Sequence, residues 1–325
     1  MAERTLRDLR TAYGNTLVRL MEQDKRIVAL DADLCRSTMT IFAEQKVPDR
    51  YIEMGIAEQN MLATAAGLAL EGKIPFVNSF AVFISGRTYD QIRQAVSIAA
   101  LNVKIVGSSC GLSDFGDGAT HQSVEDVSLM RSIPNMTVIS PCDALDVEQA
   151  LPLIVEHQGP VYMRVNRGDV PVLSEGLPPL DMKGVRRVRD GRDAVVFATG
   201  SMLVRAIDAA DALEKEGISV RVVSVTTLKP LAADLIRAET KGMRGAVTAE
   251  EHSVIGGLGC AVAGALRLTP LPLEFVGIRD RFGISGQNHA ELMELYGLTV
   301  PAVMRAVRTA LMSEPEARLA AAAAS

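Results

Sequence analysis

One acidic residue stands out in the run Met54-Gly55-Ile56-Ala57-Glu58-Gln59-Asn60, because Glu58 opens an expected helix. The other positions of this segment that we expect to face inward are apolar or small, namely Ile56, Met61, Leu62 and Ala65. A carboxylate at the start of a helix is commonly a solvated cap, stabilised by the positive end of the helix dipole. In an apolar pocket, by contrast, the pKa of Glu58 would rise and the carboxyl group could share a proton with a ligand. The stretch alone leaves both interpretations open.

Further polar side chains follow the strand expected at residues 27–30. They lie just beyond its carboxyl end, which is where ligands bind in open α/β sheets. Alternatively, these residues only cap the helix that comes next, a role for which either Ser37 or Thr38 is suited. The candidates for ligand contact by position are Asp31, Asp33, Ser37 and Thr38.

A third polar segment, Gly116-Asp117-Gly118-Ala119-Thr120-His121-Gln122, begins like the GDG motif with which thiamine enzymes hold a metal ion and a diphosphate. That motif ends in an asparagine further along the chain, and Asn135 is too close to serve. We therefore interpret Asp117 and His121 as loop residues directed into a cleft. Alternatively, Asp117 is an ordinary turn residue and His121 is a histidine on the protein surface. Because the histidines show no HxxxH spacing, we predict no metal site held by this chain.

The composition describes a globular protein of mixed charge. Of its 325 residues 48% are apolar, and the formal net charge of -5 gives no basic face for nucleic acid. The apolar runs are shorter than the roughly 18 residues that cross a bilayer. The charged N-terminus is not followed by the apolar stretch of a secretory signal, so we expect a cytoplasmic protein. The four cysteines form no CxxC pair and are expected to be buried thiols.

Strands and helices alternate along the chain. A helix is expected over residues 5–23, and strands are expected to begin at Ile27, Ile74, Val103, Met136 and Val161. This repetition predicts a mostly parallel sheet covered by helices on both faces. Prolines and glycines then interrupt the pattern, and a second α/β unit follows. We predict two three-layer α/β/α domains, the second smaller, at residues 1–172 and 191–313, with a linker at 173–190 and a disordered tail at 314–325.

Six short stretches, taken in their order and spacing, resemble the transketolase family. They match the pyrimidine-binding domain of that family, and the second α/β unit matches its C-terminal domain. The diphosphate-binding domain, which carries the family's metal ligands, has no counterpart in this sequence. The resemblance therefore implies one half of a split enzyme whose other half is a separate polypeptide. The stretches are residues 10–14, 30–33, 54–60, 79–83, 116–122 and 131–136.

The resemblance also implies a cofactor, thiamine diphosphate, and the residues that contact it. Glu58 matches the glutamate that hydrogen-bonds N1′ of the aminopyrimidine ring, where it favours proton transfer. Phe80 and Phe83 match aromatic residues packed on that ring, with ordinary core packing as the alternative. Asp33 matches an acidic residue near the thiamine and the substrate channel. The magnesium or calcium ion that holds the diphosphate would be bound by the partner subunit.

For the substrate, the resemblance implies two groups of contacts. His121 and Asp117 match residues that bind hydroxyl groups of the donor sugar, and His121 is expected to join Glu58 in catalysis. Arg10, Ser37 and Arg167 match the group that holds the sugar phosphate, for which a guanidinium fork is suited.

Two positions depart from the family pattern. Ser109 stands where the family commonly has a histidine in the phosphate group, and Gly116 stands where an acidic residue is common. Because the first departure removes a phosphate contact, a modified or less charged ketose becomes a candidate substrate.

We therefore expect the C-terminal subunit of a two-chain transketolase, which moves a two-carbon ketol unit from a ketose or its phosphate to an aldose. Its partner would be the N-terminal subunit, in a dimer of heterodimers. The alternatives are the beta subunit of a 2-oxo acid dehydrogenase decarboxylating component and an enzyme like deoxyxylulose-phosphate synthase. A non-catalytic scaffold subunit is a third alternative, against which the presence of Glu58, Phe80, Phe83 and His121 argues.

Overall fold

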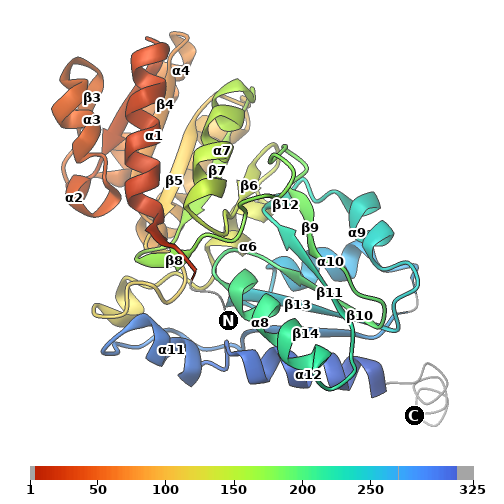
Figure 1. Cartoon of the computed structure of the whole chain (residues 1–325). Coiled ribbons are helices and arrows are strands. Elements are labelled where there is room, and N and C mark those ends of the chain that lie inside the picture. The colour runs from red at the N-terminus through yellow and green to blue at the C-terminus, as the bar shows by residue number, and fades with distance from the viewer. Residues whose placement is uncertain (1–3, 270, 313–325) are drawn as a thin grey trace.

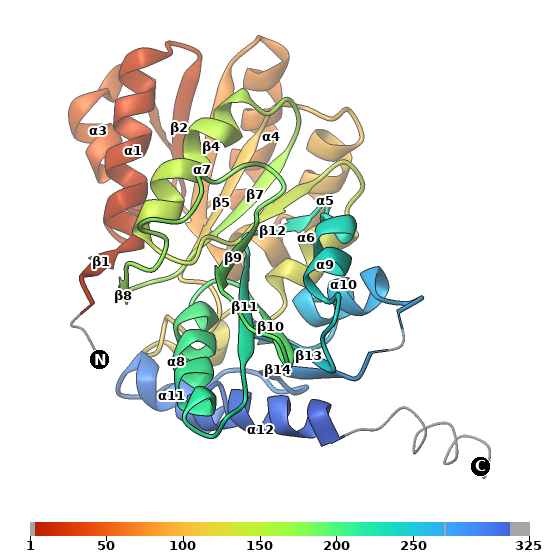
Figure 2. The same cartoon turned by 45° about the vertical axis from the view of Figure 1, so that its right-hand side comes forward.

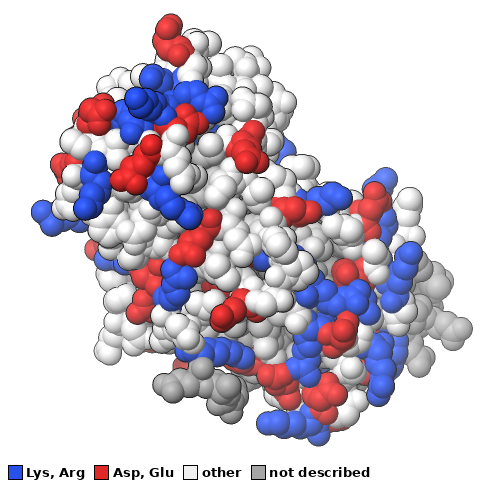
Figure 3. Space-filling model, turned by 45° about the horizontal axis from the view of Figure 1, so that its top comes forward, with Lys and Arg blue, Asp and Glu red and all other residues white. Residues whose placement is uncertain are grey.

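The protein forms two α/β domains that pack against each other, as a computed structural model of residues 4–269 and 271–312 shows (Figure 1). The tail predicted at residues 314–325 lies outside the described residues. None of the helices in the described part of the chain combines the length and apolar character needed to cross a bilayer. On the face seen in Figure 3, basic and acidic side chains are intermixed over both domains.

The first domain is built on a seven-stranded sheet in the order β12-β6-β7-β5-β4-β2-β3. Every neighbouring pair is parallel except β12, which comes from the second half of the chain and runs antiparallel to β6. The strands are β2 (Ile27–Asp31), β3 (Tyr51–Glu53), β4 (Ile74–Phe80), β5 (Lys104–Ser108), β6 (Thr137–Ile139), β7 (Val161–Val165) and β12 (Thr227–Lys229).

Helices cover both faces of this sheet because alternate strand residues point to opposite sides. Helices α1, α3 and α7 cover one face of the sheet, and α4 and α6 cover the other (Figure 2). Ile27 and Ala29 belong to the core on the first face, and Val28 and Leu30 belong to the core on the second. The helices are α1 (Leu9–Gln23), α2 (Cys35–Thr38), α3 (Ile41–Lys46), α4 (Glu58–Leu70), α5 (Tyr89–Gln91), α6 (Asp126–Ser132) and α7 (Ala144–Glu156). Two π-helical turns, at residues 83–87 and 92–97, flank α5.

The second domain contains a five-stranded sheet in the order β14-β13-β10-β11-β9, parallel except at its edge strand β9. Helices α8 and α12 cover one face, and α9 and α10 cover the other. The strands are β9 (Val185–Arg189), β10 (Ala194–Ala198), β11 (Val220–Val225), β13 (Gly245–Ser253) and β14 (Leu273–Ile278). The helices are α8 (Met202–Glu214), α9 (Ala233–Glu239), α10 (Leu258–Ala265), α11 (His289–Leu295) and α12 (Val300–Met312). The prediction of two three-layer α/β/α domains is thus confirmed.

Several local expectations were wrong. The helix expected from residue 5 begins at Leu9, because residues 6–8 form a short strand, β1, that pairs with β8 (Asp169–Pro171). The segment expected as a linker contains β9, which extends the second sheet. Ile56, expected to face inward, is 76% exposed because it precedes the helix. Among the cysteines, Cys110 and Cys142 are buried as expected, but Cys35 is half-buried and Cys260 is exposed.

Candidate active site

Glu58 is the first residue of α4, and only 3% of its side chain is exposed. This burial excludes the solvated cap. The apolar pocket that was the other interpretation also needs correction, because a cation is present. Arg87 Nη1 lies 2.7 Å and 2.8 Å from the two carboxylate oxygens of Glu58. The carboxylate is therefore paired with a guanidinium, at a position in the first turn of the helix where the dipole favours a negative charge.

Two aromatic rings lie beside this ion pair. Phe80 ends β4 and Phe83 begins the π-helical turn that follows, and their ring centroids are 6.0 Å apart with planes inclined by 15°. The guanidinium carbon of Arg87 lies 4.7 Å from the centre of the Phe83 ring. His121 meets both rings edge-on, at centroid distances of 5.2 Å from Phe83 and 6.2 Å from Phe80. The structure thus brings the four predicted residues of this region, Glu58, Phe80, Phe83 and His121, into one group.

Arg87 was missed by the sequence analysis. Its four-residue spacing from Phe83 on an expected helix was the available signal, since residues at that spacing are neighbours on a helix surface. The ion pair with Glu58 spans 29 positions of the chain and has no local signature.

Asp31 and Asp33 follow β2 as expected, but their environments differ. Asp31 is buried and accepts hydrogen bonds from Thr38 Oγ1, Thr40 Oγ1 and the Leu34 N–H. Burial raises its pKa to about 6, against the opposing effect of these hydrogen bonds. It therefore orders the loop that follows β2.

Asp33 is exposed, and hydrogen bonds to Glu53 connect the loop that contains Asp33 with the segment that leads into α4. Glu53 Oε1 accepts the Asp33 N–H at 2.9 Å and the Gly55 N–H at 2.8 Å. Asp33 itself takes up the left-handed conformation, with φ of 62°. The Asp33 loop is thus fixed next to the segment that ends at Glu58.

A loop from Ser109 to Gln122 carries the predicted sugar-binding residues. Asp114 is buried and forms an ion pair with Arg167, with 3.0 Å between Oδ1 and Nη1. Burial raises the pKa of Asp114, the Arg167 charge opposes that shift, and the Asp117 carboxylate adds to it. The Gln122 side chain donates to the Asp114 and Ile284 carbonyl groups and so fastens the loop to the second domain.

The predicted phosphate-binding residues are brought together in part. Arg10 donates from Nη1 to the Ser37 carbonyl at 3.1 Å, and its Nη2 lies 3.2 Å from Asp8 Oδ2. The β1–β8 ribbon places Asp8 opposite Asp169, so the chain segments that carry Arg10 and Arg167 adjoin. Ser109 is buried and has φ of 53°.

Glu251 fixes the site loop to the second domain and was not predicted. Its Oε1 accepts from the Leu112 N–H at 2.8 Å and lies 2.9 Å from His289 Nε2. Its Oε2 accepts from Asn166 Nδ2 and from Ser201 Oγ. Although burial alone would raise the pKa of Glu251, His289 and the hydrogen bonds lower it to about 2. A buried carboxylate with these partners holds the domain interface in place.

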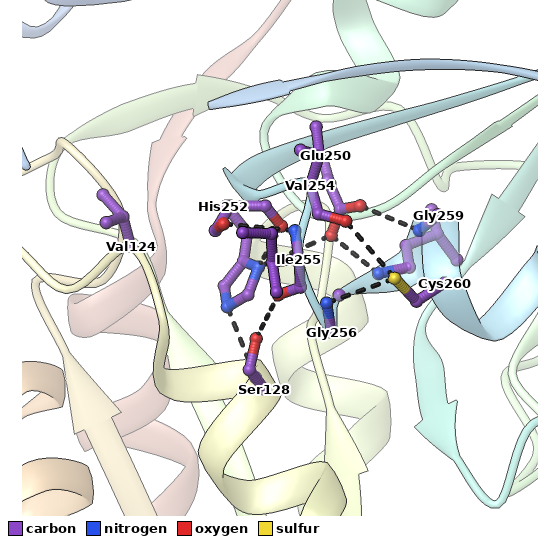
Figure 4. A network of polar contacts seen from close by, with 12 residues as sticks. Val124, Ser128, Glu250, His252, Val254, Ile255, Gly256, Gly259 and Cys260 are labelled. Atoms are coloured by element: carbon purple, nitrogen blue, oxygen red, sulfur yellow. Dashed lines mark hydrogen bonds and ion pairs between the residues drawn. The ribbon is translucent and has the colours of Figure 1, made fainter. Parts of the chain in front are cut away.

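A second polar network lies at the domain interface (Figure 4). Glu250 accepts the backbone N–H groups of Leu258 and Gly259, at 2.7 Å and 2.8 Å, and thereby caps α10. His252 Nδ1 lies 2.7 Å from the Ser253 carbonyl, which favours a proton on Nδ1 and leaves Nε2 to accept from the Ser128 N–H. These contacts join α6 of the first domain to β13 and α10 of the second.

One buried group in the described part of the chain has the donor atoms of a metal site, Cys142, Asp143 and Asp146. Its carboxylates already have partners. Asp143 accepts the N–H groups of Asp146, Leu173 and Ser174, and Asp146 is paired with Arg186. We therefore assign no metal to it, and a chain without its own metal ion remains our prediction.

Comparison with known proteins agrees with this arrangement. The family model of the transketolase pyrimidine-binding domain matches residues 6–172, and that of the transketolase C-terminal domain matches residues 183–303. The chain is 42% identical to the 6-deoxy-6-sulfo-D-fructose transketolase subunit SqwH of Clostridium sp. (strain MSTE9), over 92% of each chain. It is 36% identical to one of the subunits of the apulose-4-phosphate transketolase of Phocaeicola vulgatus, over 89% of this chain and 93% of that one.

A solved structure supports the same assignment. The chain is 41% identical to a split gene transketolase, described as an inactive beta4 tetramer, with a TM-score of 0.84 over 93% of this chain and 97% of the other. The chain thus belongs to the transketolase family. Within that family it corresponds to the C-terminal subunit of a split transketolase, because its relatives include such subunits and it matches the pyrimidine-binding and C-terminal domains of the family.

The family uses thiamine diphosphate, and the residues of this site fit its aminopyrimidine ring. The evidence for this fit is the position of Arg87, a planar cation that donates to Glu58 and lies over the Phe83 ring. A protonated aminopyrimidine is also planar, can donate to a carboxylate and can stack on an aromatic ring. Glu58, Phe80 and Phe83 would hold the ring, with Arg87 displaced.

Proposed function

We propose that the chain transfers a two-carbon ketol unit from a ketose to an aldose together with an N-terminal transketolase subunit. The observation that carries the proposal is the buried Glu58 carboxylate beside the stacked rings of Phe80 and Phe83. When bound, thiamine diphosphate supplies the carbon nucleophile that accepts the two-carbon unit. Glu58 holds a proton at N1′ of the pyrimidine ring, which a carboxyl group in a buried position can share.

The substrate residues act around the same group. His121 lies against the rings, where its imidazole nitrogens can form a hydrogen bond with a sugar hydroxyl. We place Asp117 at a second hydroxyl and Asp33 beside the channel. Arg10, Ser37 and Arg167 would lie at the far end of the donor sugar, and the β1–β8 pairing next to the two arginines supports this placement.

A partner subunit would complete the site. We propose that it supplies the diphosphate-binding domain and the magnesium or calcium ion, and that two copies of each chain form a cytoplasmic dimer of heterodimers. Exposed apolar side chains around the site support a protein partner, because such surface is usually covered. Ile56 is 76% exposed two residues before Glu58, and Phe282 is 78% exposed next to the Gln122 anchor.

The similarity to transketolase subunits of matching length favours this reaction over those of the 2-oxo acid dehydrogenase and deoxyxylulose-phosphate synthase types. The test is to co-express the chain with a neighbouring reading frame that carries a full GDG motif and to assay a panel of ketose donors. Because general acid–base catalysis contributes roughly a hundredfold or more, Glu58→Gln should lower kcat by at least that factor. Glu71→Gln, at the exposed end of the same helix, is the matched control. A complex that bound thiamine diphosphate and kept full turnover with Glu58→Gln would contradict the mechanism.

A further inference from the structure

Asp114 neutralises one of the two arginines at the far end of the proposed sugar site. Arg167 Nη1 lies 3.0 Å from Asp114 Oδ1, and only 3% of the Asp114 side chain is exposed. The Arg167 backbone N–H also donates to Ser113 Oγ at 3.1 Å, which fixes the pair to the loop. A buried carboxylate at this distance binds a guanidinium strongly, since little water competes with it.

The second arginine is neutralised in the same way. Arg10 Nη2 lies 3.2 Å from Asp8 Oδ2, and both side chains are largely buried. Asp8 is held in turn because its Oδ1 caps α1 by accepting the Thr11 N–H at 2.6 Å. Both guanidinium groups expected to bind a phosphate therefore already carry a carboxylate of this chain.

The charge balance of this region disfavours a doubly charged ligand. Arg10 is paired with Asp8 and Arg167 with Asp114, and the Asp117 carboxylate lies close enough to Asp114 to raise the pKa of Asp114, so three carboxylates accompany the two arginines. A phosphate dianion would have to break ion pairs and leave carboxylates uncompensated at close range, which is unfavourable at a partly buried site. A hydroxyl group, or an acid group with one charge, could bind with fewer of these losses.

We propose that Asp114 is a specificity-determining residue, which occupies Arg167 and selects donor ketoses whose terminal group carries at most one negative charge. This inference rests on the proposed ketol transfer and names its substrate class. Asp114 needs no contact with the reacting carbon atoms, because its ion pair with Arg167 keeps that guanidinium from binding the charged end of the donor. The buried Ser109, which has no charge to offer, is consistent with the same preference.

The test uses the complex with its N-terminal subunit and three donors of one carbon skeleton: fructose, 6-deoxy-6-sulfofructose and fructose 6-phosphate. The phosphate ester should have the lowest kcat/KM in the wild type. Asp114→Asn frees Arg167, so kcat/KM for fructose 6-phosphate should rise about tenfold, mainly through KM, as expected for one added charge contact. In the same variant kcat/KM for fructose should change less than about threefold, and the change for the sulfonate should lie between those for the other two donors.

Two further variants separate this effect from a general disturbance. Asp190→Asn removes a carboxylate that is 83% exposed and should leave the donor order unchanged. Arg167→Gln should abolish the gain in the Asp114→Asn background, because the gain depends on the freed guanidinium. If Asp114→Asn fails to fold, the order of kcat/KM for the three donors with the wild-type complex tests the inference by itself.

The outcomes distinguish the inference from the proposed function. A wild-type complex that prefers fructose 6-phosphate to the other two donors would overturn the inference and leave ketol transfer intact. An unchanged donor ratio in folded Asp114→Asn would also overturn it. Failure of the complex to transfer a ketol unit from every donor would contradict the proposed function itself, and the inference with it.

Discussion

Arg87 covers the Glu58 carboxylate, with Nη1 at 2.7 Å and 2.8 Å from its two oxygens and the guanidinium carbon 4.7 Å from the centre of the Phe83 ring. These are the contacts that the aminopyrimidine ring of the cofactor would make with the same two residues. Since both groups cannot use one carboxylate edge and one ring face together, Arg87 would have to leave for the cofactor to bind as we propose. Its side chain is 46% exposed, so it has solvent to move into.

We therefore predict that Arg87→Ala strengthens the binding of thiamine diphosphate to the two-subunit complex. A partly exposed ion pair of this kind contributes up to about 1 kcal/mol, which corresponds to roughly a threefold to fivefold lower Kd. Titration calorimetry at fixed magnesium concentration measures the change. Arg93→Ala, an exposed arginine in the adjoining turn, is the control and should leave Kd unchanged. Unchanged or weaker binding by Arg87→Ala would show that Arg87 does not compete with the ring.

The isolated chain should bind neither magnesium nor thiamine diphosphate tightly. In the proposed site Glu58, Phe80 and Phe83 would contact only the pyrimidine ring, whereas the diphosphate and its metal ion would be bound by the partner subunit. Calorimetry with the isolated chain should show no saturable heat at micromolar cofactor, and addition of the partner should restore it. Tight, magnesium-dependent binding to the chain alone would disprove the proposed division of the site.

A buried ion pair beside the domain interface gives a stability prediction. Arg164 Nε lies 2.7 Å from Asp126 Oδ2, both side chains are almost fully buried, and Arg164 also donates to the Glu251 carbonyl. Asp126→Asn leaves an uncompensated buried cation, which costs about 3–5 kcal/mol in comparable cases. Denaturant unfolding should show a loss of that size. Glu216→Gln breaks an exposed pair with Arg308 and should change stability by less than about 1 kcal/mol. Similar losses for both variants would refute the argument from burial.

Local patterns predicted much of the fold but few of the contacts between distant segments. Strands β2 and β7 begin at Ile27 and Val161, where the sequence pattern predicted them, because each is a short, largely apolar run. Pairings between distant segments, such as β1 with β8 and β12 with β6, have no such local signal.

The same distinction holds for the candidate site. Family resemblance identified Glu58, Phe83 and His121, and the structure places them in one group. The residues that neutralise or anchor the site were missed. Asp114 pairs with Arg167 across 53 positions, and Glu251 reaches Leu112 across 139. Such contacts depend on the assembled domains and could not be deduced from spacing along the chain.

Glu250 gives the stability of the fold a pH dependence of definite sign. Burial raises its pKa from an ordinary 4.5 to about 7, despite the two backbone N–H groups that it accepts. Between these values the folded protein holds a proton that the unfolded chain has released, so this contribution to stability is lost as the pH rises from about 4.5 to 7. His252 acts in the opposite direction, because burial lowers its pKa to about 4 and the unfolded chain takes up the proton first as the pH falls.

The contribution of Glu250 is therefore best measured as a difference between Glu250→Gln and the wild type. Glutamine cannot ionise, so the free energy of unfolding of the variant, relative to wild type, should rise between pH 4.5 and pH 7.5. The expected rise is on the order of 3 kcal/mol, from the raised pKa at 1.36 kcal/mol per unit. Urea unfolding at several pH values checks this, with the exposed Glu175→Gln as the matched control. A difference that stayed constant over this range, or fell, would mean that Glu250 is ionised throughout and that its backbone hydrogen bonds outweigh burial.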